Sequence, residues 1–245
     1  MKFNKIAKIV EGVPYTQRER GKKLYEHILE HRPENCLELG FAHGVASCYI
    51  AAALHELGQG SLTSVDLEDS KDRNPNIEQL LQTAGLQEFV TIRREKNSYN
   101  WFLKKAIEEN TSNNSCTPFY DLCFIDGAKN WTIDGLAFFL VDKLLRKDGF
   151  VLFDDYRWSY GGYSKEVLDG ITIRELSEDQ VATPNIEVIF KLLVMQHPAY
   201  ANFVVDEDWA WAQKISSDHK ELKLIVSKSL RYRALKKMRA IINRN

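Results

Sequence analysis

The sequence has little of what marks exported, membrane-bound or nucleic-acid-binding chains. Its 245 residues include only four cysteines and no CxxC pair, so neither a disulfide framework nor a cysteine zinc site is indicated. No uncharged apolar run reaches the roughly 18 residues of a membrane span, and Met1–Lys5 does not open an apolar leader. Lys and Arg number 33 against 34 Asp and Glu, which leaves no overall charge to attract nucleic acid. We therefore expect a cytoplasmic protein without a nucleic-acid partner.

The composition fits one large domain followed by a short basic tail. With 44% hydrophobic and 27% charged residues, the chain can bury a sizeable core. We expect an α/β domain over 1–227, in which 1–33 is a covering helical region, and a basic amphipathic helix over 228–245. Such a helix most commonly docks on its own domain, and a homodimer interface or contact with an anionic membrane surface are the alternatives.

Apolar runs alternate with helical patterns along the domain. The runs at 35–39, 61–66, 89–93, 119–126 and 149–155 predict strands, and segments of helical spacing lie before, between and after them. Near-continuous apolar strands indicate burial on both faces, as in a parallel sheet. The runs at 201–205 and 209–215, joined by an acidic turn, predict an antiparallel edge hairpin, whereas 110–117 reads as a loop.

Two glycines four residues apart mark the first strand-to-helix turn. Gly40 and Gly44 follow the apolar run that contains Glu38, and the apolar series from Val45 onward predicts a helix. Glycine lets backbone turn sharply and approach a ligand, and the helix N-terminus that follows favours negative charge. The alternative is an ordinary turn of an α/β protein. Taken alone, this motif does not decide between the two.

Acids close the other strands. In an open parallel sheet, ligands bind outside the carboxyl ends of the strands, and those ends carry Asp66, Asp126 and the pair Asp154 and Asp155. Asp66 lies 22 residues after Gly44, where an acid can hold a ribose diol, or else it caps the next helix. A nicotinamide-dependent oxidoreductase shares this geometry, although the turn lacks the middle glycine of GxGxxG.

These residues together resemble the class I S-adenosylmethionine-dependent methyltransferases, in particular metal-dependent O-methyltransferases of the catechol and caffeoyl-CoA type. The resemblance rests on Glu38-Leu39-Gly40 with Gly44, on Phe124-Ile125-Asp126-Gly127-Ala128-Lys129, and on Phe153-Asp154-Asp155. It implies a Rossmann-like, seven-stranded, mostly parallel sheet with helices on both faces, an antiparallel edge hairpin and the strand order 3-2-1-4-5-7-6.

The resemblance also implies roles for individual residues. Asp126, Asp154 and Asp155 correspond to the ligands of a divalent metal such as Mg²⁺, and Lys129 corresponds to a general base. The family's serine contact to the cofactor falls at Ala46, so the neighbouring Ser47 is taken as its replacement. The residues implied for S-adenosylmethionine are Glu38, Gly40, Gly44, Ser47, Asp66, Asn97, Ser98 and Asp126.

Elementary chemistry supports a metal-assisted methyl transfer. Three carboxylates at one edge repel unless a cation lies among them, and oxygen ligands suit Mg²⁺, which keeps positions open for substrate hydroxyls. Burial would lower the pKa of Lys129 and make it a usable base. The alternatives are that Asp154 and Asp155 cap a loop and that Lys129 is a surface lysine.

The expected substrate is a small molecule with a hydroxyl group. Asp155, where catechol enzymes have asparagine, makes the acid pair more similar to macrolide-sugar O-methyltransferases and favours a sugar or polyol over a catechol. The tyrosine-rich loop 156–163 is expected either to cover a substrate ring or to pack against the sheet, and His43 is a cofactor contact or a surface residue. A non-catalytic cofactor-binding partner protein remains a further alternative.

Overall fold

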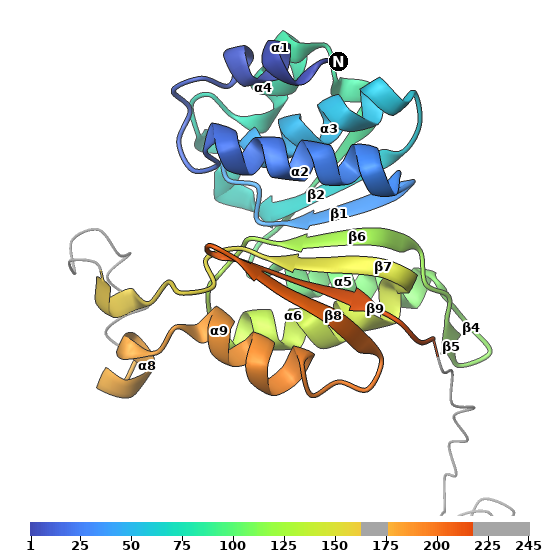
Figure 1. Ribbon diagram of the computed structural model, residues 1–245, viewed down its shortest axis with the longest axis vertical. Helices are drawn as coiled ribbons and strands as arrows, with labels where there is room; N and C mark the ends of the chain where they lie inside the picture. Colours follow the sequence, from blue (N-terminus) through green and yellow to red (C-terminus); the bar gives the residue numbers. More distant parts are fainter. Residues whose placement is uncertain (163–175, 218–245) are drawn as a thin grey trace, which may run out of the picture.

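The structure is a computed structural model that describes residues 1–162 and 176–217. Its centre is a seven-stranded sheet in the order β3-β2-β1-β6-β7-β9-β8, in which the first five strands are parallel and β9 runs antiparallel to both of its neighbours, β7 and β8 (Figure 1). The strands are β1 (Asn35–Leu39), β2 (Ser61–Leu67), β3 (Val90–Glu95), β6 (Tyr120–Ile125), β7 (Leu145–Phe153), β8 (Tyr200–Asp206) and β9 (Trp209–Lys214). The predicted fold and strand order are confirmed.

Helices cover both faces of the sheet (Figure 1). One layer is formed by α1 (Phe3–Ile9), α2 (Arg18–His31), α3 (Val45–Leu57) and α4 (Ile77–Ala84). The other is formed by α5 (Tyr99–Glu109), α6 (Trp131–Leu144) and α9 (Asn185–Ile189), which continues as a π-helical turn, η4 (Phe190–Val194). Short elements complete the described chain: η1 (Glu68–Asp72), η2 (Gln87–Phe89), η3 (Tyr160–Gly162) and α8 (Glu178–Ala182).

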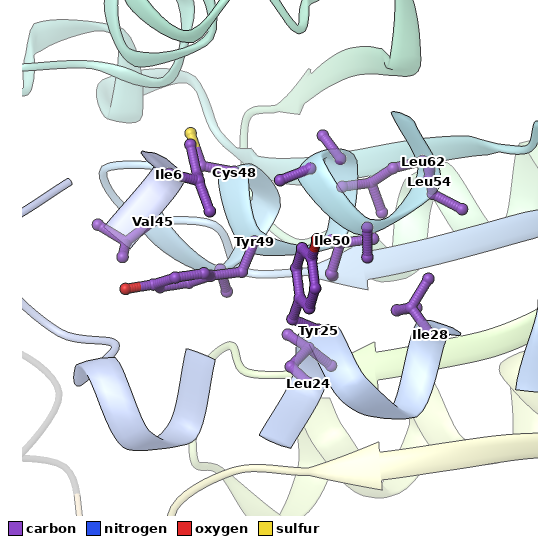
Figure 2. Packing of buried hydrophobic residues seen from close by; sticks show 14 of the residues in the cluster. Ile6, Leu24, Tyr25, Ile28, Val45, Cys48, Tyr49, Ile50, Leu54 and Leu62 are labelled. Atoms are coloured by element: carbon purple, nitrogen blue, oxygen red, sulfur yellow. The ribbon is translucent and has the colours of Figure 1, made fainter. Parts of the chain in front are cut away.

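Alternation along each strand divides the core into two clusters. In β1, Cys36 joins the cluster under α1 to α4, whereas Leu37 and Leu39 join the cluster under α5, α6 and α9. Both clusters are apolar, which is why the parallel strands read as near-continuous hydrophobic runs. Figure 2 shows the first cluster, where side chains of α1 and α2 meet those of α3.

Helix α2 packs closely on α3, and this packing brings α2 near the carboxyl ends of the strands. A Cβ at Gly21 would come within 2.2 Å of the ring of Tyr49, so only glycine allows this approach. Arg20, the preceding residue, thereby reaches the carboxyl end of β7 and pairs with Asp154. The covering helical region expected for 1–33 therefore also contributes a charge to the site.

The structure corrects one expectation about a connecting segment. The segment 110–117, expected to be a loop, contains a two-stranded hairpin formed by β4 (Thr111–Ser112) and β5 (Ser115–Cys116). The amphipathic helix expected over 228–245 lies outside the described residues. Within the described part of the chain, no helix is long and apolar enough to cross a membrane.

Candidate active site

A cavity of about 590 Å³ opens at the carboxyl ends of the parallel strands. We call its two flanks the glycine-turn side (residues 38–47 and 66) and the acid side (126–129 and 154–155). Eight of the residues expected from the sequence line this cavity: Gly40, Asp66, Asn97, Ser98, Asp126, Lys129, Asp154 and Asp155.

Backbone hydrogen bonds at the carboxyl ends of the strands hold the two sides of the cavity next to each other. The amide of Gly40 donates to Val65 O at 2.7 Å, Asp126 N donates to Leu39 O at 2.8 Å, and Asp154 N donates to Ile125 O at 3.1 Å. The residues that follow β1, β6 and β7 are therefore still tied to neighbouring strands. This explains how acids far apart in sequence reach one cavity.

The glycine turn requires glycine at both ends. Gly40 has φ +90°, and a Cβ there would lie 2.3 Å from the carbonyl oxygen of Asp126. Gly44 also has φ +90°, forms the N-cap of α3 and lies against Ile77. Such positive φ values are readily adopted by glycine alone. Gly40 consequently joins the glycine-turn side to the acid side.

Asp66 holds the glycine turn through its side chain. Its Oδ2 accepts hydrogen bonds from the amides of Phe41 at 2.9 Å and Ala42 at 2.7 Å, and its Oδ1 accepts one from Leu67 N at 2.7 Å. A carboxylate has about four lone-pair positions, so roughly one is left for a ligand. The two-point ribose contact expected for Asp66 would need one of these backbone bonds to be shared or released.

Glu38 and Ser47 contact each other and are fully buried. Glu38 Oε2 accepts hydrogen bonds from Ser47 Oγ and, at 2.6 Å, from Ser64 Oγ. Burial raises the pKa of Glu38 to about 7, against the opposing effect of the two hydroxyl donors. The expected cofactor contacts of Glu38 and Ser47 are thus not made from the cavity surface, and the pair instead supports β1 and α3 from within.

On the acid side, one carboxylate oxygen from each of Asp126, Asp154 and Asp155 can be chosen so that all three lie within 4.8 Å of one another. The Nζ of Lys129 lies 2.5 Å from Asp126 Oδ1 and 3.3 Å from Asp155 Oδ2. Arg20 Nη1 lies 2.9 Å from Asp154 Oδ1. The structure therefore brings together the three expected metal ligands and the expected base.

Burial and the neighbouring charges together shift the pKa values of this cluster. Burial raises the pKa of Asp126 well above its ordinary value, although the Lys129 ammonium opposes the shift and Asp154 adds to it. Burial alone would lower the pKa of Lys129, but the attraction of Asp126, Asp155 and Asp154 is stronger and raises it. With only the protein's own charges present, burial therefore does not make Lys129 a base, contrary to the expectation from the sequence.

The family described as a methyltransferase domain matches residues 37–156, which include both sides of the cavity. The chain contains a methyltransferase domain. No curated protein matches it. Its fold and its cavity at the carboxyl ends of the strands are those expected from the resemblance of its motifs.

Solved O-methyltransferases have a similar fold. A candidate caffeoyl-CoA O-methyltransferase from Staphylococcus aureus has a TM-score of 0.60 at 20% identity, covering 87% of this chain and 92% of that one. An O-methyltransferase from Bacillus cereus, solved with S-adenosylhomocysteine, has a TM-score of 0.59 at 18% identity, covering 87% and 90%. TomG from Streptomyces achromogenes, in complex with S-adenosylmethionine, has a TM-score of 0.58 at 16% identity, covering 87% and 89%. At these identities the similarity is one of fold.

Behind the acid side of the cavity, a buried pair supports the loop that carries Lys129. The hydroxyl of Tyr99 donates to Asp134 and accepts from Ala128 N at 3.2 Å, while Asp134 Oδ2 accepts from Asn130 N at 2.7 Å. Asp134 is fully buried, so these donors are what compensates its charge. The pair keeps the loop, and with it Lys129, close to Asp126.

The remaining walls include residues that the sequence did not single out. Tyr15, Thr16 and Arg73 line the cavity beside the glycine turn: the Tyr15 ring lies 5.8 Å from the ring of His43, and the guanidinium of Arg73 lies 5.5 Å from the centre of the Tyr15 ring. Tyr15 has φ +85°, which is unusual for a bulky residue. Nothing in the local sequence marks Tyr15 or Arg73, because they come to the cavity through the path of the chain rather than through a motif.

The tyrosine-rich loop partly packs against the core and partly lines the cavity. Tyr156 is buried in the core, and Tyr160 is buried with its hydroxyl donating to Ala128 O at 3.1 Å. Trp158 lines the cavity. His43 also lines the cavity, with Nδ1 2.6 Å from Pro75 O, and Ser98 caps α5 through Asn100 N.

Proposed function

We propose that this methyltransferase transfers the methyl group of S-adenosylmethionine to a hydroxyl group of a small molecule, assisted by a divalent cation such as Mg²⁺. The observation that carries the proposal is the grouping of Asp126, Asp154 and Asp155 within 4.8 Å, in the same cavity as the glycine turn. The similarity of fold to O-methyltransferases supports it.

The acid side fits a divalent cation. Its three carboxylates face two cationic side chains, Lys129 and Arg20, so the cluster carries one negative charge in excess. Hard oxygen donors are the ligands that Mg²⁺ prefers, and Mg²⁺ commonly binds proteins through one or two carboxylates while keeping other positions open. When bound, such a cation would polarise a substrate hydroxyl and lower its pKa.

The chain's own residues would bind the cofactor, accept the hydroxyl proton and contact the substrate ring. Gly40 and Gly44 allow the tight turn that places the N-terminus of α3 at the cavity, and the first amides of that helix, which have no intrahelical partner, would bind an anionic group. Lys129, held between Asp126 and Asp155, would be the acceptor for the hydroxyl proton once a bound cation offsets the carboxylates that raise its pKa. Trp158 and Tyr15 line the cavity with aromatic side chains, which suit a sugar or an aromatic ring.

The alternatives carry less support. A nicotinamide-dependent oxidoreductase does not fit the methyltransferase domain that spans the cavity. A cofactor-binding protein without catalysis would have no need for the acids and Lys129 in one cluster. Cys36, Cys48 and Cys123 are buried free thiols, which agrees with a reducing, cytoplasmic location.

A methyl-transfer assay tests the proposal. Radiolabelled methyl transfer to a panel of catechols, flavonoids and sugar conjugates should stop with a chelator and return with Mg²⁺. Asp154→Ala should lower the rate at least about 100-fold, because the cation supplies several kcal/mol to the transition state. The affinity of the Asp154→Ala variant for S-adenosylhomocysteine, measured by calorimetry, should change little.

Asp69→Ala provides the matched control, since Asp69 is an exposed acid away from the cavity lining. This variant should behave as the wild type in both measurements. Full activity in the presence of chelator would exclude the metal-assisted mechanism, and no binding of S-adenosylhomocysteine by the wild type would exclude the cofactor.

A further inference from the structure

The side chain of Asp154 is held by one of its two oxygens. Its Oδ1 accepts hydrogen bonds from Trp209 Nε1 at 2.8 Å, from Arg20 Nη1 at 2.9 Å and from the amide of Asp155 at 2.7 Å. Among residues 1–162 and 176–217, all hydrogen bonds found for this carboxylate are on Oδ1. Oδ2 is therefore the oxygen with lone pairs left for a cation.

Trp209 is a rigid donor. It is the first residue of β9, its side chain is 2% exposed, and its ring packs edge-on against Phe124 and Trp211 with centroids 5.8 Å and 6.0 Å away. An indole nitrogen can only donate, and a buried one needs an acceptor. Packing thus fixes where the N–H points, and Asp154 has to present one oxygen to it.

The turn before Trp209 is bound to the loop after Asp154. Asp208 O accepts from Tyr156 N at 2.8 Å, and Asp208 Oδ1 accepts from Arg157 N at 2.7 Å. Arg20 Nη2 also lies 3.7 Å from Asp208 Oδ2. The antiparallel hairpin β8–β9 and the segment carrying Asp154 and Asp155 are consequently joined through Asp208 before Trp209 and through the pairing of Ala210 with Phe153 after it.

We propose that Trp209 is a positioning residue for the candidate metal site, which orients Asp154 so that its free oxygen faces Asp126 and Asp155. The inference rests on the proposed function, because it concerns the cation of that site. Hydrogen-bonding partners of metal-ligating carboxylates typically contribute a factor of about 10–100 to metal affinity. The hairpin at the edge of the sheet then has a part in the site in addition to completing the fold.

Arg20 is less suitable than Trp209 for a test. Removing Arg20 takes away a hydrogen bond to Asp154, which weakens the site, but it also removes a positive charge that repels a cation, which strengthens it. The two effects oppose each other. Trp209→Phe removes a neutral donor while keeping an aromatic ring, so its effect on cation affinity has one sign.

The experiment measures Mn²⁺ affinity by electron paramagnetic resonance of the free ion, for the full chain with Trp209→Phe and with Trp211→Phe as the matched control. Trp211 lies two residues further along β9 and contacts Trp209, but its donor is not bonded to Asp154. Trp209→Phe should weaken Mn²⁺ binding about 10–100-fold. Its affinity for S-adenosylhomocysteine should stay within about threefold of the wild type, and Trp211→Phe should retain both affinities.

A second readout uses tryptophan fluorescence. Mn²⁺ should change the emission of the wild type and of Trp211→Phe, and Trp209→Phe should lose most of this change. Equal Mn²⁺ affinity in Trp209→Phe and the wild type, or a parallel loss of Mn²⁺ and S-adenosylhomocysteine binding, would overturn the positioning role and leave the proposed function intact. Absence of Mn²⁺ binding by the wild type would instead overturn the metal-assisted function, and the inference with it.

Discussion

The two sides of the cavity satisfy their carboxylates in different ways. On the glycine-turn side, Asp66 accepts from three backbone amides and Glu38 from two serine hydroxyls, so neutral donors suffice. On the acid side, Asp126 and Asp155 contact Lys129, and Asp154 contacts Arg20. Neutral donors hold the backbone of the turn in place. A cluster of charged side chains can instead take up a metal cation in place of one of its own positive groups. We infer from this difference that the glycine-turn side sets the shape of the cavity and that the acid side carries its reactive groups.

Substitution of Gly40 should have the largest effect, because Gly40 belongs to the glycine-turn side and contacts the acid side. Gly40→Ala places a Cβ 2.3 Å from Asp126 O at φ +90°, and backbone on the acid side would have to move. We expect a loss of about 4 kcal/mol or more in the free energy of unfolding, together with loss of S-adenosylhomocysteine binding.

Gly58→Ala is the control for backbone strain alone. Gly58 has φ +71° but no atom within 4 Å of an added Cβ, so this change should cost only about 1–2 kcal/mol. Chemical denaturation gives both free energies. Equal losses in the two variants would show that the contact between the two sides of the cavity contributes nothing beyond strain.

Substitutions of Lys129 test whether the acid side carries the reactive groups. Lys129→Met should lower kcat about 10²–10⁴-fold, as for a lost general base, with S-adenosylhomocysteine affinity nearly unchanged. Lys129→Arg keeps the positive charge between Asp126 and Asp155 but replaces a lysine that can give up its proton with a group that stays charged. If Lys129 accepts a proton, the Arg variant should be about as slow as the Met variant. Activity restored by arginine would mean that charge alone is required.

Much of this arrangement follows from local sequence. Buried parallel strands read as apolar runs, and the residues that end them, such as Asp126 and Asp154, necessarily meet at one edge of the sheet. The hydrogen bonds of those residues do not follow. Arg20 lies 134 positions from Asp154 and Trp209 lies 55 positions from it, so only tertiary packing makes them neighbours.

Two residues show a further limit of sequence reasoning. Ser47 was expected to contact the cofactor, but it lies on the buried side of α3 and donates to Glu38. Lys129 was expected to be a base through burial, but the pKa depends more on the carboxylates around it. In both cases the residue type and the approximate place are predicted, whereas its partner is decided by side-chain direction, which no motif encodes.

Glu38 gives the smallest expected effect and tests the glycine-turn side directly. Its pKa of about 7 in the folded protein exceeds the ordinary value of 4.5, mainly through burial. Between these values the folded state binds more protons than the unfolded state, so Glu38 contributes stability fully below pH 4.5 and loses it as the pH rises to about 7. The shift corresponds to about 3 kcal/mol. Glu38→Gln, which cannot ionise, should remove this loss.

The measurement is the free energy of unfolding at pH 5 and at pH 8 for the wild type and Glu38→Gln. His27, whose pKa burial lowers to about 3, destabilises the fold as the pH falls below 6.5. This contribution is common to both proteins and cancels in their difference. On going from pH 5 to pH 8, the wild type should therefore lose about 3 kcal/mol relative to the variant. An unchanged difference would mean that Glu38 stays ionised throughout, and that the glycine-turn side, like the acid side, holds a buried charge.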